Sequence, residues 1–348
     1  MNLLPMLKEH CARYPAMTTQ DCVKLLYQAV LGPSHLGRNG IPQPSYIANE
    51  MSKAKKRDLP LSESIGNGLC RLHLDSLQCQ LRPETIHGLF METAQKHKGT
   101  LEQLQEQLAL WEKNPSPFSK EDAEKEIGQL EASSYAPVSH SEAYHQAYDP
   151  HYRLIQEKLL AYVPLLEAID QRMQAGQRTL LAIDGRCASG KSTLGQLLSD
   201  IYSCPLIHMD DFFLPFPRKT SERLAEPGGN VDRERFHEEV ILPYQAVQPL
   251  SYGVYDCSVG AITRKNTVEQ APLMIVEGSY SLHPLYQDAY DLKVFLSCDP
   301  ELQSQRIMKR NGPELHRRFV EAWIPMEEQY FSAFSIPKQC DFIIYSDN

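Results

Sequence analysis

The sequence predicts a mostly α-helical N-terminal part followed by an α/β part with a parallel sheet. The chain has 348 residues, which is about two domains at roughly 150 residues per domain. Through the first 150 residues, apolar side chains recur at helical spacing. From residue 178 onward, short apolar strand patterns alternate with helical patterns, as they do where crossover helices join parallel strands.

The clearest N-terminal helix begins after Thr18. Thr18 and Asp21 form a capping-box pattern, and Gly32-Pro33 ends the apolar spacing that follows it. Further helices are expected over 45–57, 84–97 and 100–113, a strand over 70–74, and non-helical segments over 114–117 and 133–140.

A long helix is expected over 151–175, broken or kinked at Pro164 and ending at Ala175-Gly176. Three segments result: a helical domain over 1–150, a connector helix over 151–176 and an α/β domain over 177–348. The strands expected in the last segment are 179–183, 205–209, 273–276, 292–296 and 342–345.

Composition excludes several classes of protein. The net charge of −9, from 35 Lys+Arg and 44 Asp+Glu, argues against broad binding to nucleic acid. No apolar run approaches the roughly 18 residues of a membrane helix, and Lys8 and Glu9 come too early for a secretory signal. Nine cysteines without a Cys-x-x-Cys pair favour reduced thiols. We therefore expect a cytoplasmic protein, without a membrane or nucleic-acid partner; a homo-oligomer stays open.

A phosphate-binding loop is predicted between a strand pattern and a helix pattern. Residues Gly185 to Ser192 match Gly-x-x-x-x-Gly-Lys-Ser, in which glycines let backbone amides approach phosphate oxygens. Lys191 is expected to reach the β- and γ-phosphates, and Ser192 to supply a hydroxyl oxygen to Mg²⁺. A glycine-rich turn with an incidental lysine is the structural alternative. The expected nucleotide-binding residues are Gly185, Arg186, Cys187, Ala188, Ser189, Gly190, Lys191, Ser192 and Thr193.

The loop predicts for 177–348 the three-layer sandwich of the P-loop NTPases. Within the loop, a helix N-terminus could lower the pKa of the Cys187 thiol, although a tolerated small residue is the simpler interpretation.

Carboxylates at two strand ends narrow the class of nucleotide enzyme. Asp210, which follows the second strand, could accept a proton from a substrate hydroxyl and help to organise Mg²⁺, as a kinase requires. Asp211 is either a substrate contact or a turn residue. Glu277, at the end of another strand, could hold a magnesium-bound water. The Asn-Lys-x-Asp motif of a GTPase is missing from the sequence.

Basic residues follow Asp299-Pro300, a predicted helix start. Arg306 and Arg310 lie one helical turn apart, so they share a face that could close over the transferring phosphoryl group. A solvated basic helix is the alternative.

The stretch from about 179 to 348 resembles the uridine kinase and phosphoribulokinase-like group of P-loop kinases. The resemblance runs in order through the loop, Asp210–Phe213, Asn230–Asp232, Val254–Asp256, Val276–Gly278, Arg306–Arg310, Pro325, Glu327-Glu328 and Cys340–Ile344. It implies ATP and Mg²⁺ as cofactors and a small-molecule hydroxyl as acceptor. It also implies a general base at Asp210, a metal-linked acid at Glu277, lid arginines at Arg306 and Arg310, and substrate contacts at Asp232, Tyr255 and Asp256.

Two departures bear on the acceptor. Where uridine kinases carry a His and an Arg near the base, this chain has Gly260 and Ile262, and the lid has Ile307 after Arg306. Phosphoryl transfer therefore looks retained and pyrimidine recognition lost. A sugar, polyol, hydroxy acid or pantothenate-like acceptor, or a nucleotide-dependent regulatory protein, are the alternatives. The preference for ATP over GTP stays open.

The N-terminal part resembles a leading domain found ahead of such kinases in some anaerobic bacteria. The resemblance rests on Leu25–Gln28, Gly32–Leu36 and Ser139–Tyr144. His35, His140 and His145 could form a site there, although packed or surface histidines are commoner. Tyr144, Tyr148 and Tyr152 recur every four residues, which favours a packing stripe.

Overall fold

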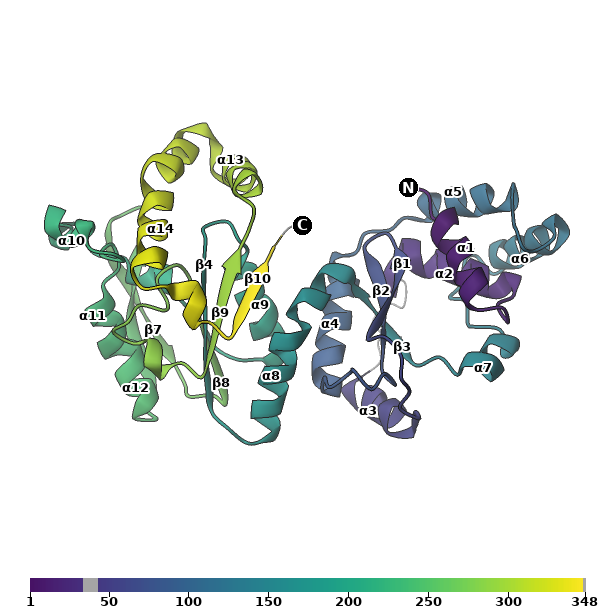
Figure 1. The fold of residues 1–348 in the computed structure, drawn as a ribbon, viewed down its shortest axis with the longest axis horizontal. Coiled ribbons are helices and arrows are strands. Elements are labelled where there is room, and N and C mark those ends of the chain that lie inside the picture. Colours follow the sequence, from purple (N-terminus) through teal and green to yellow (C-terminus); the bar gives the residue numbers. More distant parts are fainter. Residues whose placement is uncertain (34–42, 347–348) are drawn as a thin grey trace. The chain divides into compact units, whose positions relative to one another are not determined.

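The structure is a computed structural model that describes residues 1–33 and 43–346. Its internal contacts divide the chain into two compact units, Met1–Val163 and Pro164–Asn348 (Figure 1). In the described part of the chain, no helix has both the length and the apolar character needed to cross a membrane. The predicted site histidine His35 lies outside the described residues.

The N-terminal unit combines helices with a small sheet. Its helices are α1 (Leu4–Arg13), α2 (Thr19–Leu31), α3 (Pro44–Lys53), α4 (Pro83–Lys96), α5 (Leu101–Glu112), α6 (Lys120–Ala132), α7 (Glu142–Tyr148) and the 3₁₀ helix η2 (Glu157–Tyr162). Strands β1 (Ser62–Gly66), β2 (Leu69–His73) and β3 (Tyr152–Gln156) pair antiparallel in that order. The prediction of a mostly helical domain is correct for the helices, but it omitted β1 and β3.

Helix α2 is the central helix of this unit, and most of its side chains are buried. The predicted cap is present, because the Asp21 carboxylate accepts the Thr18 amide at 3.0 Å. The helix ends at Gly32, whose φ of +57° suits glycine. Tyrosines pack nearby as predicted, with the Tyr144 and Tyr148 ring centroids 4.8 Å apart.

The predicted connector helix over 151–176 is wrong in its first half. Residues Tyr152–Gln156 form strand β3, which pairs along its whole length with β2, and only α8 (Val163–Gln174) is α-helical. The open edge of β2 supplies backbone hydrogen bonds and buries Leu154 and Ile155, so tertiary pairing outweighs a local helical pattern. Pro164 does not kink a helix: it lies in the first turn of α8, where no intrahelical N–H is lost.

The C-terminal unit is built on a five-stranded parallel sheet of order β10-β9-β4-β8-β5. These are the five predicted strands: β4 (Thr179–Gly185), β5 (Leu206–His208), β8 (Leu273–Glu277), β9 (Leu292–Ser297) and β10 (Phe342–Tyr345). The remaining elements are α9 (Lys191–Tyr202), η3 (Met209–Phe212), η4 (Phe216–Arg218), α10 (Ser221–Ala225), α11 (Arg233–Phe236), η5 (His237–Ile241), α12 (Leu242–Gln245), η6 (Gln287–Ala289), α13 (Pro300–Arg318), η7 (Phe319–Trp323), α14 (Ile324–Ala333) and η8 (Ile336–Gln339).

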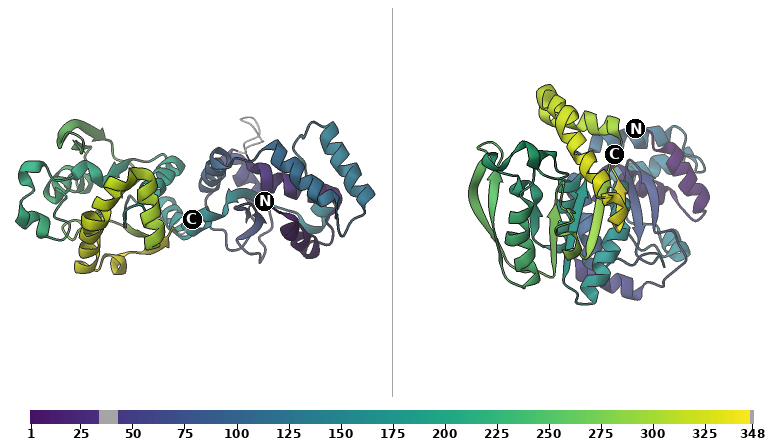
Figure 2. Two further views of the ribbon diagram at one scale, coloured as in Figure 1. Left: turned by 90° about the horizontal axis from the view of Figure 1, so that it is seen from above. Right: turned by 60° about the vertical axis from the view of Figure 1, so that its left-hand side comes forward.

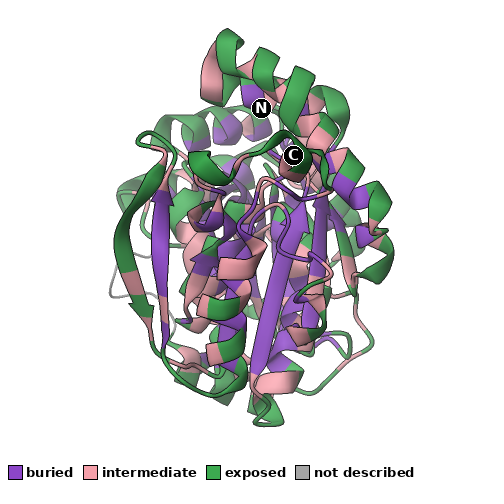
Figure 3. Ribbon diagram, turned by 90° about the vertical axis from the view of Figure 1, so that its left-hand side faces the viewer, coloured by how far each residue is buried: buried purple, intermediate pink, exposed green. Residues whose placement is uncertain are grey.

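A two-stranded antiparallel hairpin, β6 (Leu250–Asp256) with β7 (Ala261–Val268), lies outside the main sheet and was not predicted. Strand β6 is mostly buried, whereas β7 faces solvent, which Figure 3 shows as a purple and a green strand side by side. The hairpin carries Tyr255 and Asp256 at its turn.

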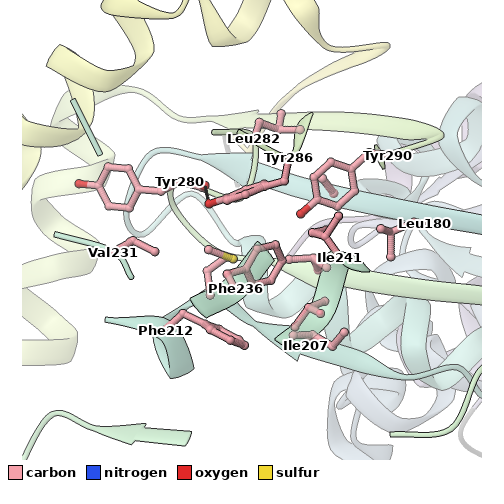
Figure 4. Packing of buried hydrophobic residues seen from close by; sticks show 14 of the residues in the cluster. Leu180, Ile207, Phe212, Val231, Phe236, Ile241, Tyr280, Leu282, Tyr286 and Tyr290 are labelled. Carbon is pink, nitrogen blue, oxygen red and sulfur yellow. Dashed lines mark hydrogen bonds between the residues drawn. The ribbon is translucent and has the colours of Figure 1, made fainter. Parts of the chain in front are cut away.

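The core on one side of the sheet is rich in aromatic side chains. Residues of β4 and β5 pack there against η3, α11 and the segment after β8, as Figure 4 shows for Leu180, Ile207, Phe212, Phe236 and Tyr286. This packing fixes the carboxyl ends of the strands. Beyond the carboxyl ends of β9 and β10 lies α13, as Figure 1 and the right-hand view of Figure 2 show.

Candidate active site

The loop between β4 and α9 has a backbone that requires glycine at its start. Gly185 has a φ of +142°, and a Cβ there would meet the Leu296 carbonyl oxygen of β9 at 2.0 Å. Gly190, with a φ of +97°, is the N-cap of α9, which begins at Lys191. Six residues thus turn the chain from a buried strand into a helix whose free N-terminal amides attract anions.

Lys191 folds back onto this loop. Its Nζ donates hydrogen bonds to the carbonyl oxygens of Gly185 at 2.7 Å and Arg186 at 2.9 Å. The loop therefore holds a positive charge at its own backbone, as expected for a lysine that meets phosphate. Thr193 follows in the first turn of α9 and is exposed.

The strand ends bring Ser192, Glu277 and Asp210 together. Ser192 Oγ donates to Glu277 Oε2 at 3.2 Å. The pKa of Asp210 is raised, first because protein atoms crowd a carboxylate that solvent still reaches, and second by the negative charge of Glu277. Lys191 acts in the opposite direction, so its charge also reaches Asp210.

His208 belongs to this cluster and was not predicted. Its Nδ1 lies 2.6 Å from Glu277 Oε1, and this hydrogen bond raises the pKa of His208. It precedes Asp210 by two residues at the end of β5, so its position beside the strand-end acid was the available signal.

The donor set fits a hard divalent cation. Ser192 Oγ and the carboxylates of Glu277 and Asp210 are oxygen ligands, the type that Mg²⁺ takes together with waters and phosphate oxygens. Within residues 1–33 and 43–346, no group of three His, Cys, Asp or Glu side chains is arranged to hold a metal unaided. A cation here would need phosphate or water as further ligands.

The predicted acceptor residues have different surroundings. Asp232 is buried, caps α11 by accepting the Arg235 amide at 3.3 Å, and binds the guanidinium of Arg218 at 2.6 Å. Asp256 accepts the amide and hydroxyl of Ser258 at 2.8 and 2.6 Å, so it stabilises its own turn.

Tyr255 and Asp211 lie closer to the expected chemistry. Tyr255 is 6% exposed, and its ring centroid is 6.5 Å from that of Phe213, three residues after Asp210. Burial raises the pKa of Asp211, and the charges of His208 and Arg264 oppose this shift.

Two further acids from α14 support the loop. Glu327 accepts the Cys187 amide at 2.9 Å and the Ser279 hydroxyl at 2.6 Å, while Glu328 binds the Arg186 guanidinium at 2.7 Å. The Arg186 side chain is therefore held by an ion pair with Glu328. The suggested lowering of the Cys187 pKa is wrong: burial and then Glu327 raise it to about 12.

Asp184, at the end of β4, is another residue that sequence reasoning missed. Its buried carboxylate accepts the amides of Gly185, Tyr280 and Leu282 at 2.7–3.2 Å and the Tyr330 hydroxyl at 2.9 Å. Burial raises its pKa to about 6. It joins the loop to the segment after β8, a link that no local pattern reveals.

The two predicted lid arginines have different contacts in the structure. Arg306 donates to the Ala188 carbonyl of the loop at 3.2 Å, as well as to Ser346. Arg310 is exposed, bonds to its neighbour Asn311 and stacks on Phe319 at 5.9 Å, so it is not brought to the loop. Helix α13 is interrupted at Gly312, where φ is +75°, next to Pro313.

Among known proteins, only solved structures are similar to this chain. No protein-family model matches the chain, and no curated protein matches it. A solved structure of a possible uridine kinase from Bacillus stearothermophilus is 20% identical over 52% of this chain and 99% of that chain, with a TM-score of 0.39. A proposed fructose transport system kinase from Silicibacter sp. TM1040 is 20% identical over 51% and 97%, with a TM-score of 0.39. Shikimate kinase from Bacteroides thetaiotaomicron is 14% identical over 49% and 86%, with a TM-score of 0.24.

The predicted fold class is confirmed: an α/β chain with a five-stranded parallel sheet that follows a mostly helical region.

Proposed function

We propose that this protein is an ATP-dependent kinase that transfers the γ-phosphoryl group to a hydroxyl of a small molecule. The observation that carries the proposal is the cluster of Asp210 and Glu277 beside Ser192 and Lys191 of the loop. A switch protein needs a phosphate loop and a cation site, but it has no use for a further carboxylate that can take a proton from an alcohol.

Asp210 is the proposed general base. Its raised pKa strengthens the Asp210 carboxylate as a base toward an acceptor hydroxyl. Lys191, Arg306 and the N-terminus of α9 oppose the negative charge of the transferring group. Mg²⁺, held through Ser192, Glu277 and Asp210, would neutralise charge on the phosphate oxygens. Arg310 would contribute only after the lid moves.

Glu277 holds His208 and Ser192 through its two carboxylate oxygens. It therefore orients the Ser192 hydroxyl and keeps a second negative charge next to Asp210. These two effects make Glu277 a positioning group for the cation and the base.

The acceptor side favours an alcohol other than a pyrimidine nucleoside. The Phe216 ring covers Gly260, and a Cβ at that position would meet this ring at 2.7 Å. No side chain at position 260 could read a base while Phe216 lies there. A sugar, polyol, hydroxy acid or pantothenate-like acceptor is accordingly preferred over uridine.

The test is acceptor-stimulated release of ADP from ATP with a panel of nucleosides, sugars and organic alcohols. Asp210→Asn should lower turnover about 10²–10⁴-fold, because it removes the proton acceptor and weakens one oxygen ligand of the cation. ATP should still bind, because the loop and Lys191 are unchanged. Asp200→Asn, an exposed position on α9, is the matched control and should behave as wild type. Turnover that survives Asp210→Asn would refute the general base. Tight ATP binding without stimulation by any acceptor would favour a regulatory protein.

A further inference from the structure

The segment around α10 and α11 carries four arginines whose charges are all neutralised by carboxylates. The pairs are Arg218–Asp232 at 2.6 Å, Arg223–Glu234 at 2.8 Å, Arg233–Glu226 at 2.5 Å and Arg235–Glu239 at 3.1 Å. Lys219, in the same segment, differs. Among the described residues, no carboxylate lies within 4.0 Å of its ammonium group.

Lys219 is instead held between two aromatic rings. Its Nζ lies 5.0 Å from the ring centroid of Phe216 and 5.8 Å from that of Tyr255. Aromatic faces attract a cation without cancelling its charge, and they displace part of its water. The ammonium group thus keeps its charge beside the two rings and stays available to an anion.

This ammonium lies on the acceptor side of the proposed active site. Tyr255 connects it to Phe213, which follows the proposed base Asp210 along the chain. Both charges act on the exposed thiol of Cys257: burial and Asp210 raise its pKa, whereas Lys219 lowers it. Lys219 and Asp210 therefore act on the same region, around Tyr255 and Cys257.

Arg264 is a second cation on the hairpin that carries Tyr255, on strand β7. It makes no ion pair with a carboxylate in the described part of the chain, and its charge lowers the pKa of Asp211. The acceptor side thus combines the acids Asp210 and Asp211 with Lys219, which lies beside Tyr255, and with Arg264, whose charge acts on Asp211. A neutral alcohol would leave Lys219 without a charged partner.

We propose that Lys219 determines acceptor specificity by binding an anionic group, so that the acceptor is a hydroxylated carboxylate or phosphate ester. This rests on the proposed kinase function. The hydroxyl to be phosphorylated faces Asp210, and the anion is bound by Lys219. Because Nζ lies beside the rings of Phe216 and Tyr255, the distance between hydroxyl and anion becomes part of the selection.

The first experiment compares acceptors that differ only in the anion. Suitable pairs are pantothenate with panthenol and glycerate with glycerol for a carboxylate, and ribose 5-phosphate with ribose for a phosphate. The anionic member of at least one pair should have the higher kcat/KM for ADP release. Lys219→Gln should lower that preference about tenfold, mainly through the KM of the acceptor, and leave ATP affinity unchanged. Lys265→Gln, an exposed lysine on β7, is the matched control.

The second experiment does not depend on turnover. Cys257 is alkylated with iodoacetate, an anion, and with iodoacetamide, its neutral analogue, and the product at Cys257 is quantified by peptide mass spectrometry. Lys219→Gln should reduce the ratio of the two rates several-fold, and Lys265→Gln should not.

The outcomes separate the two proposals. If the ratio of alkylation rates at Cys257 is the same in wild type and Lys219→Gln, or if neutral acceptors are used as well as anionic ones, the assignment of Lys219 is overturned. If ATP binds and no acceptor stimulates ADP release, while the alkylation ratio still depends on Lys219, the kinase proposal fails and the anion site stands.

Discussion

Acidification should destabilise the N-terminal unit through His140. This side chain is 8% exposed; its Nδ1 lies 2.8 Å from Asp21 and its Nε2 lies 2.7 Å from the Tyr152 hydroxyl. Burial lowers the pKa of His140 from 6.5 to about 4, and the charges of Arg71 and Lys24 add to that effect. Asp21 opposes it, but that carboxylate also accepts hydrogen bonds from Thr18 and Ser141 and is largely satisfied by them.

The sign and size follow from proton linkage. As the pH falls below 6.5, the unfolded chain takes up a proton at His140 before the folded chain does. The contribution of His140 to the free energy of unfolding is therefore complete above pH 6.5 and decreases toward pH 4. The two pKa values correspond to a loss of about 2 kcal/mol at pH 5 and about 3 kcal/mol at pH 4.

The assay is urea unfolding of the full chain at pH 7 and pH 5, followed by circular dichroism. His140→Gln removes the titrating group, so this variant should lose about 2 kcal/mol less than wild type between the two pH values. The exposed His145→Gln should behave as wild type. Equal losses in wild type and His140→Gln would refute the reasoning, because they would mean that Asp21 keeps His140 protonated in the folded state.

Three further predictions concern the loop. Gly185→Ala should destabilise the C-terminal unit by about 3 kcal/mol or more in urea unfolding and abolish ATP binding, because its Cβ would overlap the Leu296 carbonyl; a variant that binds ATP normally would contradict this. Glu327→Ala leaves the Cys187 amide without its acceptor and should cost about 1–3 kcal/mol, whereas Glu327→Gln, which retains an oxygen, should cost less; equal losses would count against the hydrogen bond. Arg306→Gln should weaken ATP binding about tenfold by calorimetry, and Arg310→Gln should change it less than twofold, since only Arg306 contacts the loop; the reverse order would place the wrong arginine at the nucleotide.

The parallel sheet could be predicted because its central strands β4, β8 and β9 are buried on both sides and its strand patterns are separated by helical ones. Each of the five runs, such as Leu292–Leu296, is a short apolar segment whose position follows from composition alone. The loop at 185–192 could equally be predicted, since the positions of its glycines and its lysine form a pattern of neighbouring residues. Strand β3 could not be predicted, because its backbone pairs with β2, about 80 residues earlier in the chain.

In the candidate site too, some features depend on neighbouring residues and others on residues far apart in the sequence. The predicted phosphate loop and its strand-end acids could be recognised from the sequence, because a strand–loop–helix unit and a carboxylate after a strand depend on adjacent residues. Only the tertiary structure decided that His208 binds Glu277, that Glu327 holds Cys187, that Arg306 rather than Arg310 contacts the loop, and that Lys219 lies between two rings. Each of these contacts either joins residues on different elements or is set by how a side chain packs, so its energy depends on packing that no local pattern records.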